Sequence, residues 1–432
     1  MRSIAVATAA LAGVVNMCLA APAAPAPEQL HVYPATNNTA DGMYTVLWVH
    51  QAPLAVVKAA APALQQRTSA GLGAPATAAA SCWTYDVDGF AGTICKAPVT
   101  GVPTGGSLQY RVGCDSLSWS TWRVLRSPAA TAVRMLAYAD GGIAWSNGTM
   151  AGLAADAATG QYGAVLNHGD ISYANDYKPA SNNSWVWDQY LNEAEAHLDG
   201  RAGPHVCIVG NHEAQHNFMP YLNRTAMPRG STRPLGRFYS YTAVGPVSVI
   251  SFSTEHDVSP GSEIFDFVAS SLQHAASSSV RRERPWIVVQ THHPFLCTDL
   301  LTFSTRCVEQ AERFRADLEG LFMVAKVDLF FSGHNHMLEA SWPYANGTHS
   351  EDLHNAYERG TVYVVNGNFG DIEGIEPFFV ENPGFRMLDS SMSVDTGYAR
   401  LDVTMTSLAV DFVNSRTGSV WHNFTLTKDA QA

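Results

Sequence analysis

Basic side chains are scarce in this sequence, which has 26 lysines and arginines against 38 aspartates and glutamates and a formal net charge of −12. Proteins that bind nucleic acid present basic surfaces to the phosphate backbone. The charge balance therefore argues against a nucleic-acid partner.

Long apolar runs are also scarce. One run, over residues 4–19, follows Arg2 and is followed by small residues, as in a signal peptide. Its length of about 16 residues is short for a membrane span, which needs about 20. We expect a cleaved signal peptide over residues 1–20, with an uncleaved anchor as the minority alternative. The mature protein is then secreted or extracellular without a membrane span, while a vacuolar, lysosomal or cell-surface location stays open.

Apolar residues, in contrast, are plentiful. The 432-residue chain is 46% hydrophobic and 15% charged, which excludes a disordered protein and provides for a large core. This length exceeds that of one typical domain, so two domains are expected.

Cysteines are few, and removal of the signal peptide would leave six of the seven. An even number in a secreted chain permits disulfides. Cys297 and Cys307 flank a short loop and form the pair that we expect. Cys207 lies in a Val/Ile run, where a buried free thiol is at least as plausible. The pairing of four cysteines stays open: Cys82, Cys95, Cys114 and Cys207.

Six Asn-x-Ser/Thr sequons predict N-glycosylation of a secreted chain, at Asn37, Asn147, Asn182, Asn223, Asn346 and Asn423. They carry no information about catalysis.

Residues 26–127 have an all-β pattern. Short β-branched or aromatic runs at 30–33, 44–48 and 108–112 are separated by Gly, Pro and Asn, which predicts a small β-sandwich. Within it, an Ala-rich tract over about 53–80 has few bulky apolar residues and no clear period. We expect this tract to be an insertion or a mobile loop.

After Ser127-Pro128 the sequence alternates between strand and helix signals, which predicts a second domain over residues 131–428 with a parallel or mixed sheet. Polar clusters begin just after successive apolar runs, at Asp140, Asp170, Asn211, His292 and the pair His334/His336. In open α/β sheets, ligands bind beyond the carboxyl ends of the strands. We therefore expect these side chains to converge in one crevice.

The pair His334 and His336 is suited to metal binding. Residues i and i+2 of an extended backbone point to the same side, so both imidazoles project together. They can serve one ion or two neighbouring ions, which in two-metal hydrolases lie about 3.5–4 Å apart.

Five blocks of sequence resemble the metal-binding motifs of the purple acid phosphatases, within the calcineurin-like metallophosphoesterases. In chain order they are Asp140-Gly141-Gly142, Gly169-Asp170-Ile171-Ser172-Tyr173, Gly210-Asn211-His212-Glu213, Val289-Gln290-Thr291-His292 and Gly333-His334-Asn335-His336. The front of the chain, at residues 27–31 and 110–113, resembles the fibronectin type III-like domain of the larger members. The resemblance thus covers nearly the whole mature chain.

This resemblance implies the fold and the cofactors. The fold would be α/β (α+β), with the β-sandwich followed by a metallophosphoesterase sandwich of mixed sheets flanked by helices. The family pattern places Fe(III) on Asp140, Asp170, Tyr173 and His336, which suits a hard, oxygen-seeking ion. It places a second divalent ion (Zn, Fe or Mn) on Asp170, Asn211, His292 and His334. A metal-bound hydroxide would then attack the phosphorus atom while both cations stabilise the phosphoryl oxygens.

The resemblance assigns His212 to the leaving group or the phosphate, and a protonated donor there favours acidic pH. Plant members carry a further histidine pair beyond the fourth block, and residues 294–299 contain none. His293 and His256 are candidates for the missing substrate-binding donor. A structural role for each is the alternative.

The function that we expect is a secreted acid phosphatase acting on a small phosphate monoester. The alternatives are a phosphodiesterase or nucleotide pyrophosphatase on the same site, or a non-catalytic surface glycoprotein that retains the fold. A non-catalytic relative is expected to lack at least one metal ligand, and none is missing here. The physiological substrate, the second metal and the oligomeric state stay open.

Overall fold

The computed structural model of this chain describes residues 26–179, 181–299, 305–376, 380, 383–387 and 395–429. The expected signal peptide lies outside these ranges. No helix within them is long and apolar enough to cross a membrane.

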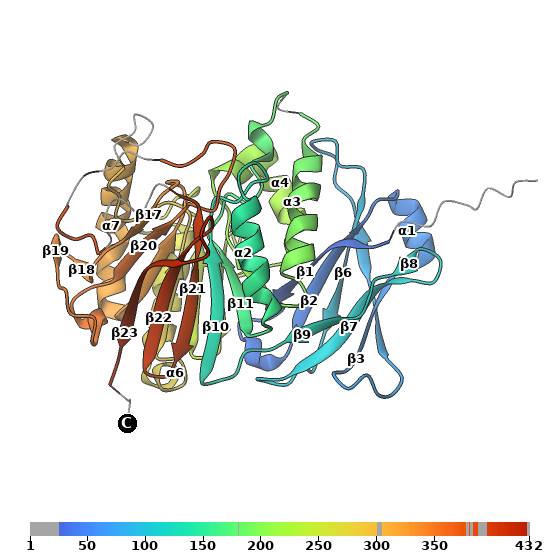
Figure 1. The fold of residues 1–432 in the computed structure, drawn as a ribbon, viewed down its shortest axis with the longest axis horizontal. Helices are drawn as coiled ribbons and strands as arrows, with labels where there is room; N and C mark the ends of the chain where they lie inside the picture. The colour runs from blue at the N-terminus through green and yellow to red at the C-terminus, as the bar shows by residue number, and fades with distance from the viewer. Residues whose placement is uncertain are drawn as a thin grey trace, which may run out of the picture.

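The front of the chain folds as two β-sheets packed face to face (Figure 1). One sheet has the order β1 (Glu28–Pro34), β2 (Tyr44–His50), β6 (Thr93–Val99), β5 (Ser81–Trp83). The other has the order β4 (Ala76–Ala79), β3 (Ala63–Thr68), β7 (Ser107–Cys114), β8 (Ser118–Trp119), with β9 (Arg123–Arg126) paired to β7. Trp48 and Tyr110 are fully buried between the sheets. The all-β prediction for this region is confirmed.

The prediction of an insertion or mobile loop over about 53–80 is wrong. This stretch forms α1 (Leu54–Ala60), β3 and β4. β3 pairs along its whole length with β7, which is distant in sequence. Val57 and Leu64, two of the few bulky residues of the tract, are fully buried in the sandwich core. Non-local pairing therefore orders a segment whose local sequence has no period.

Two mixed sheets form the second domain. The first has the order β12 (His205–Cys207), β11 (Tyr162–Asn167), β10 (Ala132–Tyr138), β21 (Gly397–Thr404), β22 (Ser407–Asn414), β23 (Val420–Thr427). The second has the order β13 (Tyr239–Val244), β14 (Val247–Phe252), β15 (Trp286–Gln290), β16 (Leu329–Ser332), β20 (Val362–Asn366), β17 (Leu338–Ala340). In the first sheet, β11 pairs in parallel with both β10 and β12. In the second sheet, the neighbouring strands from β14 through β15 and β16 to β20 pair in parallel. The remaining pairs in both sheets are antiparallel.

The two mixed sheets face each other, and helices cover their outer faces. Met135 and Leu166 of the first sheet pack with Val249, Val288 and Phe331 of the second. The first sheet is covered by α2 (Asn147–Ala158) and α3 (Ser184–His197), and the second by α5 (Glu263–Ala276) and α7 (Thr305–Ala325). Figure 1 shows α2 and α3 beside β10 and β11, on the side of the front sandwich. The predicted fold class is confirmed.

The remaining elements are short. They are α4 (Met219–Arg224), α6 (Ser278–Glu283), β18 (Tyr344–Ala345), β19 (Thr348–His349) and the 3-10 helices η1 (Thr39–Asp41), η2 (Ala174–Asp176), η3 (Asn211–Phe218) and η4 (Ala356–Glu358).

A buried arginine joins the two domains. Arg224, at the end of α4, is fully buried and donates hydrogen bonds to Gln29 (2.9 Å) and Tyr85 (2.6 Å) of the front sandwich. It also donates to Asp188 (2.7 Å) and Ser184 (2.7 Å) of α3. Since a buried charge is tolerated only when it is paired and hydrogen-bonded, this network fixes the front sandwich against α3.

The expected Cys297–Cys307 disulfide is present, and a second disulfide joins Cys82 to Cys95. Cys114 and Cys207 are buried free thiols, as the alternative for Cys207 anticipated. Five sequon asparagines are exposed, whereas Asn223 is half-buried and hydrogen-bonded to Trp83. Glycosylation itself stays a prediction.

Leu64 and Leu72 provide a matched test of the corrected region, because Leu64 is fully buried and Leu72 is 75% exposed. We expect Leu64→Ala to lower the free energy of unfolding by about 2–5 kcal/mol and Leu72→Ala to change it by less than about 0.5 kcal/mol. Chemical denaturation of both variants measures the difference. Equal losses, or none, would contradict an ordered β3.

Candidate functional site

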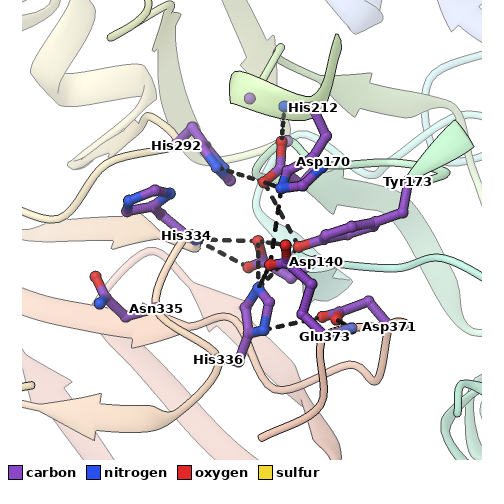
Figure 2. A network of polar contacts seen from close by, with 12 residues as sticks. Asp140, Asp170, Tyr173, His212, His292, His334, Asn335, His336, Asp371 and Glu373 are labelled. Carbon is purple, nitrogen blue, oxygen red and sulfur yellow. Dashed lines mark hydrogen bonds and ion pairs between the residues drawn. The ribbon is translucent and has the colours of Figure 1, made fainter. Parts of the chain in front are cut away.

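The polar residues that follow the strands meet at one end of the two facing sheets. Asp140 follows β10, Asp170 follows β11 and Asn211 lies beyond β12, all in the first sheet. His292 follows β15, and the His334/His336 pair follows β16, in the second sheet. In Figure 2, Asp140, Asp170, His292 and His336 converge, with the Tyr173 hydroxyl pointing into the cluster and Asn335 lying apart from it. The structure thus brings the predicted residues together.

One group of donor atoms is rich in oxygen. The Tyr173 hydroxyl lies 3.1 Å from Oδ1 of Asp140, 3.5 Å from Oδ2 of Asp170 and 2.8 Å from Nε2 of His336. The backbone N–H of His334 donates to both carboxylate oxygens of Asp140, at 3.1 and 2.9 Å. Three oxygen-bearing side chains and one imidazole therefore surround a single point.

A second group is rich in nitrogen and shares Asp170 with the first. Oδ1 of Asn211 lies 3.0 Å from Nε2 of His292 and 2.9 Å from Nδ1 of His334. Nε2 of His292 also lies 2.9 Å from Oδ2 of Asp170. Asp170 thus lies between the two groups.

Two carbonyl groups fix the tautomers of the imidazoles. Nδ1 of His292 donates to the carbonyl oxygen of His168 (3.0 Å), and Nδ1 of His336 donates to that of Gly374 (2.8 Å). In the neutral rings, the Nε2 lone pairs consequently face oxygen atoms of the cluster. A lone pair facing an oxygen acceptor is repulsive unless a proton or a cation lies between them.

Burial makes the negative charge of the cluster costly. Burial, together with the neighbouring Asp170 and Asp371, raises the pKa of Asp140 well above its usual range. Burial and the carboxylates of Asp140 and Asp170 likewise raise the pKa of the Tyr173 hydroxyl. Burial lowers the pKa of His334 well below its usual value, and the neighbouring His293 and His292 lower it further. Although burial lowers the pKa values of His292 and His212, the negative charge of Asp170 raises both to about 10, so these imidazoles balance part of the charge.

Several of these residues have strained backbones. The φ angles of Asp140 (60°), Asp170 (49°), Tyr173 (56°) and His334 (70°) lie in the left-handed region that non-glycine residues rarely adopt. Such conformations cost of order 1–3 kcal/mol each and gather at functional sites.

The glycines of the motifs make room for the carboxylates. A Cβ atom added at Gly333 would lie 2.4 Å from Oδ2 of Asp140, and one added at Gly210 would lie 2.1 Å from Oδ1 of Asp170. The glycines at the ends of the apolar runs are therefore needed for close approach.

Glu213 received no role from the sequence, although it stands in the third block. Its carboxylate is buried and accepts hydrogen bonds from the backbone N–H groups of Asp170 (2.9 Å), Ile171 (2.9 Å) and Gly210 (2.8 Å). Burial and the charge of Asp170 raise its pKa to about 7, although these N–H groups lower it. Glu213 thereby holds the second and third blocks together.

Asp371 and Glu373 were also missed. Oδ2 of Asp371 lies 3.3 Å from Nδ1 of His336, and Oε2 of Glu373 lies 3.8 Å from Nε2 of His212 and 3.9 Å from Nε2 of His336. Both follow β20, so the rule that polar clusters follow apolar runs, applied to residues 362–365, would have found them.

A cavity of about 700 Å³ opens over the cluster. Besides the predicted residues it is lined by the carboxylates Glu255, Glu373 and Glu376, and its lining contains no lysine or arginine among the residues that the structure describes. His293 lines this cavity, and its Nε2 lies 2.9 Å from Glu255. His256 does not line it, because its ring packs against Phe218 and Phe238.

His212 is held at the edge of the cluster. Its Nδ1 lies 3.0 Å from both Oδ1 of Asn175 and Oδ2 of Asp176, and its ring packs against Tyr173. Nε2 is left on the cavity side, 3.8 Å from Oδ2 of Asp170.

The role of Glu213 can be tested by Glu213→Gln, which keeps the shape of the side chain but turns an amide N–H towards a backbone N–H. We expect the free energy of unfolding to fall by about 1–3 kcal/mol, the cost of an unpaired buried donor. The control is Glu309→Gln on the exposed face of α7, with a change below about 0.5 kcal/mol. Equal stability of the two variants in chemical denaturation would show that Glu213 organises nothing.

Comparisons with known proteins agree with this geometry. A model of the calcineurin-like phosphoesterase family matches residues 155–338, and a model of the iron/zinc purple acid phosphatase-like protein C family matches residues 360–422. Acid phosphatase type 7 of Homo sapiens is 30% identical over 317 residues, covering 68% of each chain. Purple acid phosphatase 1 of Ipomoea batatas is 29% identical over 248 residues, covering 53% of this chain and 48% of the relative.

Among solved structures, a purple acid phosphatase from seeds of yellow lupin (Lupinus luteus) has a TM-score of 0.74 at 20% identity, over 94% of this chain and 75% of that one. This likeness shows a shared fold. Together with the family models and the human relative, it shows that the chain belongs to the purple acid phosphatases, within the calcineurin-like metallophosphoesterases.

Proposed function

We propose that this protein is a secreted acid phosphatase that hydrolyses phosphate monoesters at a binuclear centre of Fe(III) and a divalent ion. The observation that carries this proposal is the pair of donor groups that share Asp170. Asp140, Asp170 and Tyr173 gather there with Nε2 of His336 and Nε2 of His292 turned towards their oxygen atoms, as in a set of metal ligands.

The donor chemistry of the first group fits Fe(III). Asp140, Asp170 and the phenol of Tyr173 offer hard oxygen ligands, and His336 adds one nitrogen. Ionisation of a buried phenol among carboxylates requires a strongly charged cation, which Fe(III) would provide. The names of one matching family model and of one relative support iron at this site. They are the iron/zinc purple acid phosphatase-like protein C family and Fe(3+)-Zn(2+) purple acid phosphatase 12 of Arabidopsis thaliana.

The second group fits a divalent ion. Two imidazole nitrogens, from His292 and His334, suit Zn, Fe or Mn, and the neutral amide of Asn211 keeps the site less negative than a third carboxylate would. When bound, the two metal ions supply Lewis-acid activation of water and stabilise charge on the phosphoryl oxygens.

His212 would donate the proton that the leaving group needs. Although burial lowers the pKa of His212, the charges of Asp170, Asp176 and Glu373 raise it to about 10. Positive charge beside Asp170 would lower this value again. Since Asn175 and Asp176 hold Nδ1, the proton on Nε2 faces the cavity and can pass to the departing oxygen.

The charges of the cavity favour monoesters over the nucleotide pyrophosphatase alternative. Glu255, Glu373 and Glu376 would repel the extra phosphates of a nucleotide or of pyrophosphate, and the described cavity lining offers them no lysine or arginine. A monoester with a neutral or cationic leaving group meets no such repulsion. His293, fixed by Glu255 beside His334, would contact the bound ester.

We expect an acidic optimum when phosphate release from an aryl monoester is measured from about pH 4 to about pH 9, since such a profile reports the essential acid and base. Asn211→Ala and His336→Ala should each lower kcat by roughly 10²–10³-fold, because each removes a donor to a cation. His349→Ala, at an exposed histidine of β19, is the control. Faster turnover of a diester or of pyrophosphate than of the monoester would favour the rival enzyme, and no turnover of any ester would favour a non-catalytic glycoprotein.

His212→Asn tests the proton donor separately. The side chain keeps a hydrogen-bonding group near Asn175 but cannot donate a catalytic proton, so kcat should fall by about 10²–10⁴-fold. Activity that depends on protonated His212 is present below its pKa and lost as the pH rises through it. The alkaline limb of the kcat profile should therefore move or vanish in the variant. An unchanged limb with a lower kcat would assign it to another group.

A further inference from the structure

A second cluster of metal-binding side chains lies where the front sandwich meets the second domain. His31 is on β1, Asp199 follows α3 and His205 is on β12. All three are buried, with exposed fractions of 1%, 6% and 8%. None belongs to the site described above, and the proposed function uses none of them.

The ligand atoms of this cluster converge. Nδ1 of His31 lies 2.7 Å from Oδ2 of Asp199, and Nε2 of His205 lies 3.7 Å from the same oxygen. The three atoms all lie within 4.8 Å of one another. Ligand atoms around one tetrahedral ion, whose bonds to nitrogen and oxygen are about 2.0–2.2 Å long, lie about 3.3–3.6 Å apart, so small shifts of these side chains would bring the three atoms onto one ion.

Hydrogen bonding leaves Nε2 of His205 unpaired where the three side chains meet. Nε2 of His31 donates to the carbonyl oxygen of Leu191 (3.1 Å), which leaves an Nδ1 lone pair towards Asp199 in the neutral ring. Nε2 of His205 is buried and has no hydrogen-bond partner among the described residues, with Oδ2 of Asp199 3.7 Å away. Oδ2 of Asp199 contacts Nδ1 of His31 at 2.7 Å. Histidines that bind metals usually donate their other N–H to such a carbonyl.

An ion pair between protonated His31 and Asp199 is the alternative explanation. It would balance these two groups but would leave Nε2 of the buried His205 unsatisfied, at a cost of about 1–3 kcal/mol. A cation satisfies all three atoms together.

A fourth ligand has space. A cavity of about 20 Å³ beside His31 and His205 is lined mostly by aromatic and apolar side chains such as Tyr33, Trp187 and Leu191, and Asp199 is not part of its lining. A volume above about 10–15 Å³ holds one water molecule. Two imidazoles, one carboxylate and one water form a donor set that is typical of zinc.

We propose that His31, Asp199 and His205 bind one divalent transition-metal ion, Zn²⁺ in the first place, that fastens the front sandwich to the second domain. The ligands come from β1, from the turn after α3 and from β12, so a bound ion would connect both domains at one point. His205 lies six residues before Asn211. The ion would therefore also fix the strand that leads to the third block.

The test counts zinc ions in protein whose proposed catalytic centre has been disabled by His334→Ala and His336→Ala, so that the two sites are distinguishable. This protein is stripped with a chelator and titrated with Zn²⁺, and bound zinc is measured by inductively coupled plasma mass spectrometry. We expect one ion per chain from this cluster, lost in His205→Gln and in Asp199→Asn but retained in the control His349→Gln. Zn²⁺ should raise the melting temperature only where the cluster is intact.

Anomalous diffraction from crystals of the otherwise unchanged protein soaked in Zn²⁺ gives a measurement that requires no variant to fold. A peak within about 2.0–2.2 Å of Nδ1 of His31, Oδ2 of Asp199 and Nε2 of His205 is expected. Absence of that peak, or equal zinc content with and without the substitutions, would show that the cluster is an ion pair and overturn the proposal.

Discussion

The shared carboxylate of Asp170 is the constraint on which the rest of this structure depends. It is nearly fully buried and is contacted from both mixed sheets, by His292 after β15 and by Tyr173 and the backbone of His212 from the first sheet. A charge in such a place is tolerated only when it is surrounded by partners. The two sheets must therefore bring their strand ends to the same point, and the packing of the domain follows from this requirement.

The local backbone serves the same constraint. Asp140, Asp170 and His334 reach the centre only through left-handed turns, and Gly210 and Gly333 leave room for the carboxylates beside them. These turns are unfavourable in isolation. The hydrogen bonds from three N–H groups to Glu213 help to keep the second and third blocks in place. The polar contacts immediately around the site and the large core between the sheets thus offset the cost of these turns.

Sequence reasoning succeeded where the signal was local and failed where it was not. Strands such as β15 and β16 could be predicted because their apolar runs end at a glycine or a polar residue, and their order placed His292 and His334 at one edge. The formation of β3 as an ordered strand could not be predicted. It depends on pairing with β7, which lies 40 residues or more further along the chain. The same limit applies to Glu213, whose importance lies in the backbone groups that it holds. His256 looked like a site residue because of its position in a polar loop, and only the packed structure places it against aromatic rings.

The position of β21 between β10 and β22 has a consequence for biosynthesis. The strand that precedes Asp140 pairs on one side with β11 and on the other with residues near the carboxyl terminus. During translation this sheet stays open along β10 until residues 397–404 have left the ribosome, and contacts of such long range form slowly. A nascent chain therefore holds Asp140 and Asp170 on an incomplete sheet until β21 has been made.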